Sequence, residues 1–479
     1  MSLFCEPKKD KPAMGGIKEM LTIALPMVVS HACYTIMIFT DRLFLSRLGS
    51  EEMNAAMGGG LTSFMMMTFF IGLIGYSTAV TAQYFGAGQK RQCPVVAAQA
   101  GIIAIIAYPL IIIFKPLGYF LFDLMKINPV QAGLQRIYFN ILLYGSVVGL
   151  FRCCLSGFFT AIGRTKIVMT ASFTAMAVNV LVSYTLIFGK FGFPALGIRG
   201  AAYGTIIGGI SGLFMMLFRY FSKGNRFEYG VNQSFHFNKE VMGTLLRFGY
   251  PAGLEMFLNI LAFNIVVMMF HSLGLVTATA VTIAFNWDMV SFIPLIGVEI
   301  GVTSLIGRYL GARRPDIAQR SVISGLKLGM IYSSLILIFF LGFPSFLVNI
   351  FRPSVLNDIF IKALPTAVFM VRFASLYVLV EAIMIVFIGT LRGAGDSFWA
   401  MFLSVSLHWI LVPILFVMLK VWRLSAEAGW VAMILVFFVF SFLIYLRYRS
   451  GKWKDIKMIH PQPEPVVVVH SGFPESPDL

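Results

Sequence analysis

Long apolar runs recur along the chain from Met20 to about Tyr445, and short polar turns separate them. Runs of about 20 apolar residues match the hydrocarbon thickness of a membrane, whereas a transmembrane barrel shows short alternating segments. We therefore predict an all-α polytopic membrane protein with twelve transmembrane helices. The expected spans are 20–47, 54–84, 93–118, 130–160, 165–189, 198–222, 240–272, 277–309, 317–346, 358–392, 397–420 and 426–448.

The composition agrees with a membrane chain. Of 479 residues, 58% are hydrophobic and only 12% are charged, which is too little charge to cover a soluble protein of this size. A net charge of +16 would suggest nucleic acid in a soluble protein, but no basic-aromatic array accompanies it here. The five cysteines have neither metal-ligand nor disulfide spacing, and the chain has no phosphate loop. We expect no cofactor, no nucleic-acid partner and no enzymatic activity.

The basic residues gather in alternate loops, which indicates a membrane topology. The longest basic loop lies near 219–247, and shorter basic turns hold Lys90 and Arg91, Arg164 and Lys166, and Arg313 and Arg314. Because Lys and Arg favour the cytoplasmic side, we expect both termini in the cytoplasm and the chain in the cell (inner or plasma) membrane. We expect no cleaved signal peptide, and a monomer surrounded by membrane lipids.

An internal repeat divides the chain into two halves. The segment "GLIGYSTAVTAQYFGAG" (72–88) matches "GVEIGVTSLIGRYLGAR" (297–313) without gaps, at a separation of 225 positions. The same offset pairs Pro26 with Pro251. An even number of spans in each half gives both halves the same orientation, which is the parallel-repeat architecture of transporters with a substrate path between the lobes.

These boundaries predict four regions. A cytoplasmic N-terminal tail covers 1–19, an N-lobe of six helices covers 20–228, and a C-lobe of six helices covers 229–450. The last segment, 451–479, is rich in proline and is expected to be a disordered cytoplasmic tail.

One acid lies inside the first apolar span, in "IMIFTDRLFL" (36–45). A carboxylate within a membrane helix is costly, so Asp41 is a candidate binding residue. Its repeat partner is Val266, so the shared fold does not require an acid there. The structural alternative is an ion pair with Arg47, which lies about two turns nearer the membrane surface.

The second half holds more acids within its spans. Glu255 and Asn259 share one helix face at an i, i+4 spacing, and Pro251 just before them can free backbone carbonyls. Asp288 and Glu299 lie eleven positions apart and also share a face. If the two helices face each other, Glu255 and Glu299 could share one proton, or hold one sodium ion with Asn259. The alternative for Asp288 and Glu299 is a buried, protonated acid bonded to a helix neighbour.

For other polar residues a structural role, such as helix capping or core packing, is an alternative to a functional one. Asp396 precedes "SFWAMF" and has the composition of a helix N-cap, so capping and ion binding are equally open. Glu381 fits a packing hydrogen bond. The lone histidines His31, His271 and His408 fit satisfied core groups rather than a proton relay.

Several motifs together resemble the multidrug and toxic compound extrusion family of cation-coupled antiporters. They are "ALPMVV" and "FTDRLFLSRLGSEEMNAA" in the first span, "TAQYFGAGQK", "GYPAGLEMFLNILAF", "SLIGRYLGAR" and "GTLRGAGDSF". Their order, spacing and duplication cover roughly 20 to 447. The resemblance implies a V-shaped pair of lobes around a central cavity, with sodium or proton influx driving export of bulky organic cations.

The resemblance also assigns site residues. The family's first-helix acid falls on Asp41, and its fifth-helix Asn and Asp fall on Asn179 and Ser183, so that half of this pair is missing. The seventh-helix acid falls on Asn259, with Glu255 one turn earlier, and a later acid falls on Asp396. This distribution favours a coupling site in the second lobe, and leaves open whether the ion is sodium or a proton.

A lipid-linked glycan flippase of the same superfamily is the alternative function. Such a protein needs an arginine-rich cavity to hold pyrophosphate, whereas the intramembrane charges singled out above are mostly acidic.

Thiol labelling tests the expected topology. A cysteine replacing Ser222 or Ser234 in a cysteine-free background should resist an impermeant thiol reagent added outside the cell, because the 223–240 loop is expected to be cytoplasmic. Labelling of intact cells at either position would contradict the span count and the parallel repeat.

Overall fold

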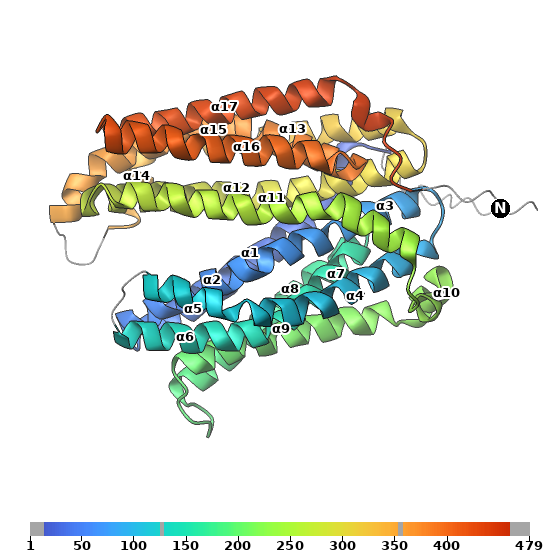
Figure 1. The fold of residues 1–479 in the computed structure, drawn as a ribbon, viewed down its shortest axis with the longest axis horizontal. Helices are drawn as coiled ribbons and strands as arrows, with labels where there is room; N and C mark the ends of the chain where they lie inside the picture. Colours follow the sequence, from blue (N-terminus) through green and yellow to red (C-terminus); the bar gives the residue numbers. More distant parts are fainter. Residues whose placement is uncertain (1–13, 125–128, 353–357, 460–479) are drawn as a thin grey trace, which may run out of the picture.

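The computed structural model describes residues 14–124, 129–352 and 358–459. All regular structure in these ranges is helical (Figure 1). The α-helices are α1 (Ile17–Ser46), α2 (Ser50–Gly75), α3 (Ser77–Gly86), α4 (Gln92–Ile113), α5 (Lys115–Leu124), α6 (Pro129–Tyr144), α7 (Ser146–Ala161), α8 (Thr165–Phe188), α9 (Ile198–Tyr220), α10 (Lys223–Tyr229), α11 (Lys239–His271), α12 (Leu275–Gly311), α13 (Pro315–Gly342), α14 (Pro344–Asn349), α15 (Asp358–Ala394), α16 (Ser397–Phe416) and α17 (Ala426–Arg449).

The predicted twelve spans are confirmed. Among the described residues, eleven helical segments are long and apolar enough to cross a membrane, and α6 with α7 makes a twelfth that bends by 44° at Gly145. Two spans end earlier than expected, α4 at Ile113 and α13 at Gly342. Each is followed by a short helix with a proline near its start, where a missing backbone N–H costs nothing.

The predicted repeat reappears as a reciprocal set of contacts between the two halves. A Cβ added to Gly72 would lie 2.7 Å from Gly253 Cα, and one added to Gly297 would lie 2.8 Å from Val28 N. Gly297 and Gly72 are 225 positions apart, and so are Gly253 and Val28. The crossing of α2 with α11 is therefore the counterpart of the crossing of α1 with α12, as a twofold axis between the halves requires.

A second reciprocal contact joins α3 to the end of α12. A Cβ on Gly86 would overlap the Arg308 carbonyl, and a Cβ on Gly311 would overlap the Gln83 carbonyl. These residues are again related by the offset of 225. Only glycine permits this backbone approach, which explains why "YFGA" and "YLGA" retain it in both halves.

The two lobes are joined at the end of the molecule that carries the N-terminus. In Figure 1 this end holds α3 and α10, whereas α5, α6 and α14 lie at the other end. Ser304 donates to the Thr160 carbonyl at 3.1 Å, and Gln83 donates to the Gly393 carbonyl at 3.2 Å. Both contacts cross between the lobes.

The start of α1 adds a charged contact to this junction. Glu19 lies 3.5 Å from Arg308 Nη1 and accepts a 2.6 Å hydrogen bond from the Tyr309 hydroxyl. Arg308 also donates to the Ala161 carbonyl at 3.2 Å and covers the Phe85 ring at 5.0 Å. A single C-lobe arginine thus contacts three N-lobe helices.

Residues 451–459 differ from the expected disordered tail, because they are ordered against the lobes. Trp453 is buried and donates to the Tyr448 carbonyl at 3.0 Å. Met458 is buried in the N-lobe core, with its sulfur 3.3 Å from the Tyr76 hydroxyl. Residues 460–479 lie outside the described residues. For the labelling test, the buried position of Ser234 leaves Ser222 as the informative site.

We expect Gly311→Leu to separate the lobes at this end, because the leucine Cβ would overlap the Gln83 carbonyl. Ser304 is fully buried there, so a cysteine at position 304 should label slowly in the wild-type background and several-fold faster with Gly311→Leu. Gly133→Leu is the matched control, since its Cβ meets nothing within 4 Å. Unchanged labelling in the Gly311 variant would contradict the assigned contact.

Candidate functional site

The N-lobe encloses Asp41 with neutral hydrogen-bond donors. Asp41 is 4% exposed, and its carboxylate accepts from Asn179 Nδ2 at 3.1 Å and from Thr205 Oγ1 at 2.9 Å. Asn179 Nδ2 also lies 3.2 Å from Ser183 Oγ, one helical turn further along α8. The i, i+4 spacing on α8 directs both side chains toward α1. Two residues that the sequence suggested, Asp41 and Asn179, are therefore brought together.

The alternative pairing of Asp41 with Arg47 is absent from the described chain, in which Asp41 has no ion pair. Arg47 caps the end of α1 and is exposed. Amide and hydroxyl donors satisfy carboxylate lone pairs but do not neutralise its charge. A buried carboxylate in such a cage is suited to binding a proton or a small cation.

The C-lobe brings Glu255 and Glu299 to one arginine. Arg392 Nη2 lies 2.9 Å from Glu255 Oε2, at an ion-pair distance without hydrogen-bond alignment, and Arg392 Nη1 donates to Glu299 Oε1. The three side chains come from α11, α12 and α15. Glu255 is only 2% exposed. Two carboxylates and one guanidinium leave one negative charge without a cationic partner in this triad.

The predicted sodium site of Glu255, Asn259 and Glu299 stays a prediction, and in this arrangement Arg392 lies against both of its carboxylates. The positive guanidinium lies within ion-pair distance of both carboxylates, and it donates a hydrogen bond to Glu299. Asn259 turns to α16 and donates to Ser404 Oγ at 2.7 Å. In the described ranges, no group of three or more acidic, histidine or cysteine side chains could hold a metal ion.

A second acidic pair lies deeper in the C-lobe. Asp288 on α12 and Glu381 on α15 are electrostatic neighbours. Asp288 Oδ1 and Glu381 Oε2 are both buried without a hydrogen-bond partner among the described residues. Two adjacent carboxylates in a low-dielectric interior cannot both be ionised cheaply, so this pair suits a shared proton or a bound cation. The sequence pattern predicts only a packing hydrogen bond for Glu381.

Asp396 lies in a separate ion pair. Arg447 on α17 contacts it twice, with Nε at 2.7 Å and Nη2 at 3.0 Å, and covers the Trp399 ring at 4.9 Å. Asp396 does occupy the N-cap position of α16, but its side chain makes no capping hydrogen bond. The pair instead fastens the turn between α15 and α16 to α17, apart from the Arg392 triad.

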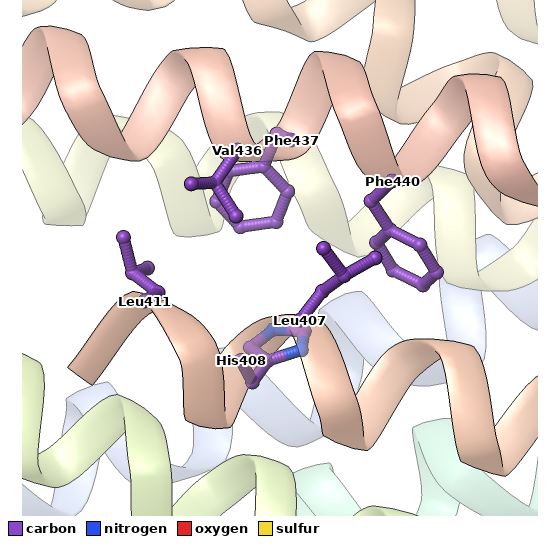
Figure 2. Close-up of a pocket in the computed structure, with 6 residues that line it drawn as sticks. All are labelled: Leu407, His408, Leu411, Val436, Phe437 and Phe440. Atoms are coloured by element: carbon purple, nitrogen blue, oxygen red, sulfur yellow. The ribbon is translucent and has the colours of Figure 1, made fainter. Parts of the chain in front are cut away.

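His408 behaves as a packed core group. Its Nδ1 lies 2.7 Å from the Ser404 carbonyl, and its ring packs edge-on near Phe437 and Phe440. Figure 2 shows it beside a small cavity between α16 and α17 that is otherwise apolar. The cavity volume is about 10 Å³, which holds at most one water molecule and no substrate.

Arg392 is the member of the candidate site that sequence reasoning missed. It stands at the last position of the expected span 358–392, where an arginine ordinarily extends to the membrane surface. Helix α15 continues to Ala394, and Tyr76 and Gln83 of the N-lobe contact this end of it. The signal available was the glycine-rich "GTLRGAG" (389–395), since glycines allow close helix contact around a polar residue.

Comparison with known families decides what kind of protein this is. A family model described as MatE matches residues 26–185 and 251–418, which together make up more than half of the chain. The chain belongs to the MATE family of transporters. The two matched blocks fall on the two lobes, in agreement with the repeat.

Curated MATE relatives match almost the whole chain. A probable multidrug resistance protein NorM from Thermotoga maritima is 27% identical over 94% of this chain and 95% of its own length. A multidrug resistance protein MdtK from Photorhabdus laumondii is 24% identical over 95% of this chain and 98% of its own length.

Solved structures support the same fold. A MOP superfamily transporter from Pyrococcus furiosus aligns with a TM-score of 0.83 at 19% identity, over 91% of this chain and 96% of that one. An outward-facing multidrug resistance MATE transporter aligns with a TM-score of 0.81 at 20% identity, over 92% and 97%. At this identity the likeness establishes the fold and leaves the substrate open.

We expect Asp396→Asn and Arg447→Gln each to lower the stability of the purified protein, by about 3–5 kcal/mol for a buried pair, because each leaves its partner's charge unpaired. The double variant should be no less stable than the single variants. Thermal unfolding in detergent measures this cycle. Loss of efflux with unchanged stability in Asp396→Asn would instead indicate that Asp396 acts in transport.

Proposed function

We propose that this MATE transporter is an antiporter that exports amphipathic organic cations, driven by sodium or proton influx. The observation that carries this proposal is the triad of Glu255, Glu299 and Arg392, which has one unmatched carboxylate charge. A proton, a sodium ion or a cationic substrate can each supply the missing positive charge, and two at once are disfavoured. The multidrug names of the curated relatives agree with small organic substrates.

The triad adjoins the contact between the lobes. The Tyr76 hydroxyl, from the N-lobe, donates to the Arg392 carbonyl at 2.8 Å, next to the Gln83 contact with Gly393. A change of charge at Arg392 therefore acts on the residues that hold the lobes together. Loaded and discharged states need to differ by only a few kcal/mol to exchange populations of the two lobe arrangements.

The proposed direction of transport follows from the topology. With both termini in the cytoplasm of the cell, the joined end of the molecule is the cytoplasmic one, and the basic loops near α10 lie on that side. The contacts between the lobes then lie at the cytoplasmic end, and in the proposed cycle substrate is released outside and the coupling ion is admitted from outside. In this scheme Asp41 is a second cation site, in the N-lobe.

Glycan flipping has less support. A pyrophosphate-binding cavity needs arginines free to meet the ligand, whereas Arg392 is already committed to two carboxylates. Four acids inside the C-lobe helices outnumber this arginine: Glu255 and Glu381 are buried, and Asp288 and Glu299 are half-buried.

The coupling role predicts that Glu255→Gln and Glu299→Gln uncouple efflux from the ion gradient. Each change neutralises the triad, so we expect gradient-driven efflux of a fluorescent cation in vesicles to fall at least about tenfold, the effect of roughly 1.4 kcal/mol. Binding of the same cation to purified protein should survive in at least one variant. Separate sodium and proton gradients identify the ion.

Asp316→Asn is the matched control, because Asp316 forms an exposed ion pair with Arg314 at 3.1 Å and should leave efflux unchanged. If both glutamate variants keep wild-type efflux and ion dependence, the triad is not the coupling site. Asp41→Asn would then be the variant expected to abolish coupling.

A further inference from the structure

The N-lobe contains a lateral cavity that transport through the lobes does not use. Its volume is about 260 Å³, and its walls are almost entirely apolar. It lies between α4, α7 and α9, and the segment 235–237 that leads into α11 closes one side. None of the residues of the Asp41 cage or the Arg392 triad lines it. Ile105, Phe235 and Phe237 at its rim are about 60% exposed, so it opens toward the surroundings of the N-lobe.

The depth of this cavity matches one leaflet of a bilayer. On α4 its lining runs from Ala97 to Ile105, about 8–20 Å from the start of that helix at 1.5 Å per residue. On α9 it is lined by Leu217 and Tyr220, in the last turn. The start of α4 and the end of α9 lie at the same end of the lobe. The cavity therefore extends from the membrane surface to about the middle of the hydrocarbon.

Side-chain hydrogen bonds and an aromatic stack hold the rim of the cavity in place. Gln99 is fully buried, and its side chain donates to the His236 carbonyl at 2.8 Å and accepts from the Asn238 amide at 3.2 Å. These two bonds fasten the segment before α11 to α4. Phe235 stacks on Phe221, with ring centroids 5.9 Å apart and planes inclined by 20°. The cavity is therefore held open by polar contacts behind it and an aromatic stack at its edge.

Basic side chains follow the lining residues at the membrane surface. Arg219 precedes Tyr220, Lys223 lies two positions after Phe221, and Lys239 lies two after Phe237; all three are exposed. None of the three forms an ion pair within the described part of the chain. The nearby acid Glu228 is occupied by Lys90 and Arg164, each at 2.9 Å. The exposed acid Glu240 adjoins Lys239, so the charged residues next to the lining in sequence carry a net positive charge.

We propose that this cavity binds one acyl chain of an anionic phospholipid, with its phosphate held by Arg219, Lys223 and Lys239. A cationic amphiphile would meet the same apolar walls but like charges at the rim, so the basic residues select the anionic lipid. The bound lipid packs against 235–237, which lies in the connection between the two lobes, and so stabilises that connection. This site does not rest on the proposed antiport.

Lipid titration of the purified full-length chain tests the site, with native mass spectrometry as the readout. Phosphatidylglycerol should add one tightly held molecule, and phosphatidylcholine should bind more weakly. Arg219→Gln with Lys223→Gln should weaken phosphatidylglycerol binding by about fivefold for each charge removed. It should leave phosphatidylcholine binding unchanged.

Gly101→Leu should abolish the tight binding, because its Cβ meets only Phe151 Cε1, at 3.6 Å, and the leucine would project into the cavity. Gly133→Leu, which fills no cavity, should bind as the wild type does. If Gly101→Leu fails to fold, the exposed charge variant decides alone. Equal binding of both lipids by the wild type, stronger binding of a cationic lipid, or unchanged binding in the charge variant would each overturn the proposal.

Discussion

Close backbone contact between the two halves is the constraint on which the rest of the structure depends. At Gly86 and Gly311 each half presents a glycine to a carbonyl of the other, and at Gly72 and Gly297 the helices meet as closely. Any side chain at these positions would force the lobes apart. The contact brings α3 beside the end of α15, so that Tyr76 reaches the Arg392 backbone. Lobe closure and triad geometry therefore depend on each other.

The halves share a backbone but not a charge pattern. At the 225 offset Glu255 falls on Ser30 and Glu299 on Ile74, while Asp41 falls on Val266. Each lobe has thus acquired its own acids on a common scaffold. Their surroundings also differ, since neutral donors enclose Asp41 while a guanidinium joins Glu255 and Glu299. The electrostatic surroundings of the acids thus differ between the lobes, because a counter-ion already in place changes what a further charge would gain by binding.

The charged groups at the joined end of the molecule, unlike Asp41, are paired with an opposite charge. Arg308 meets Glu19 and the Ala161 carbonyl, and Asp396 meets Arg447 with two donors. These contacts hold helix ends and turns in place, and Met458 of the segment 451–459 packs beside them against Gly395 and Tyr76. Opening at this end must break or slide several of these contacts together, which favours two discrete lobe arrangements over a continuous range.

The sequence by itself determined the spans, the duplication and which acids lie within the membrane. Hydropathy reports burial in lipid directly, a 225-residue offset is visible in the letters, and an acid such as Asp41 or Glu299 stands out in an apolar run. Only the tertiary structure decided which side chains these polar groups contact. The sequence did not distinguish an arginine at a span's end that extends to the surface from Arg392, which turns inward, because that choice depends on which helices cover it. For the same reason the sequence did not indicate that Asn259 donates to Ser404, or that Asp396 pairs with an arginine 51 positions away. Pairing energies arise between helices that only folding brings together.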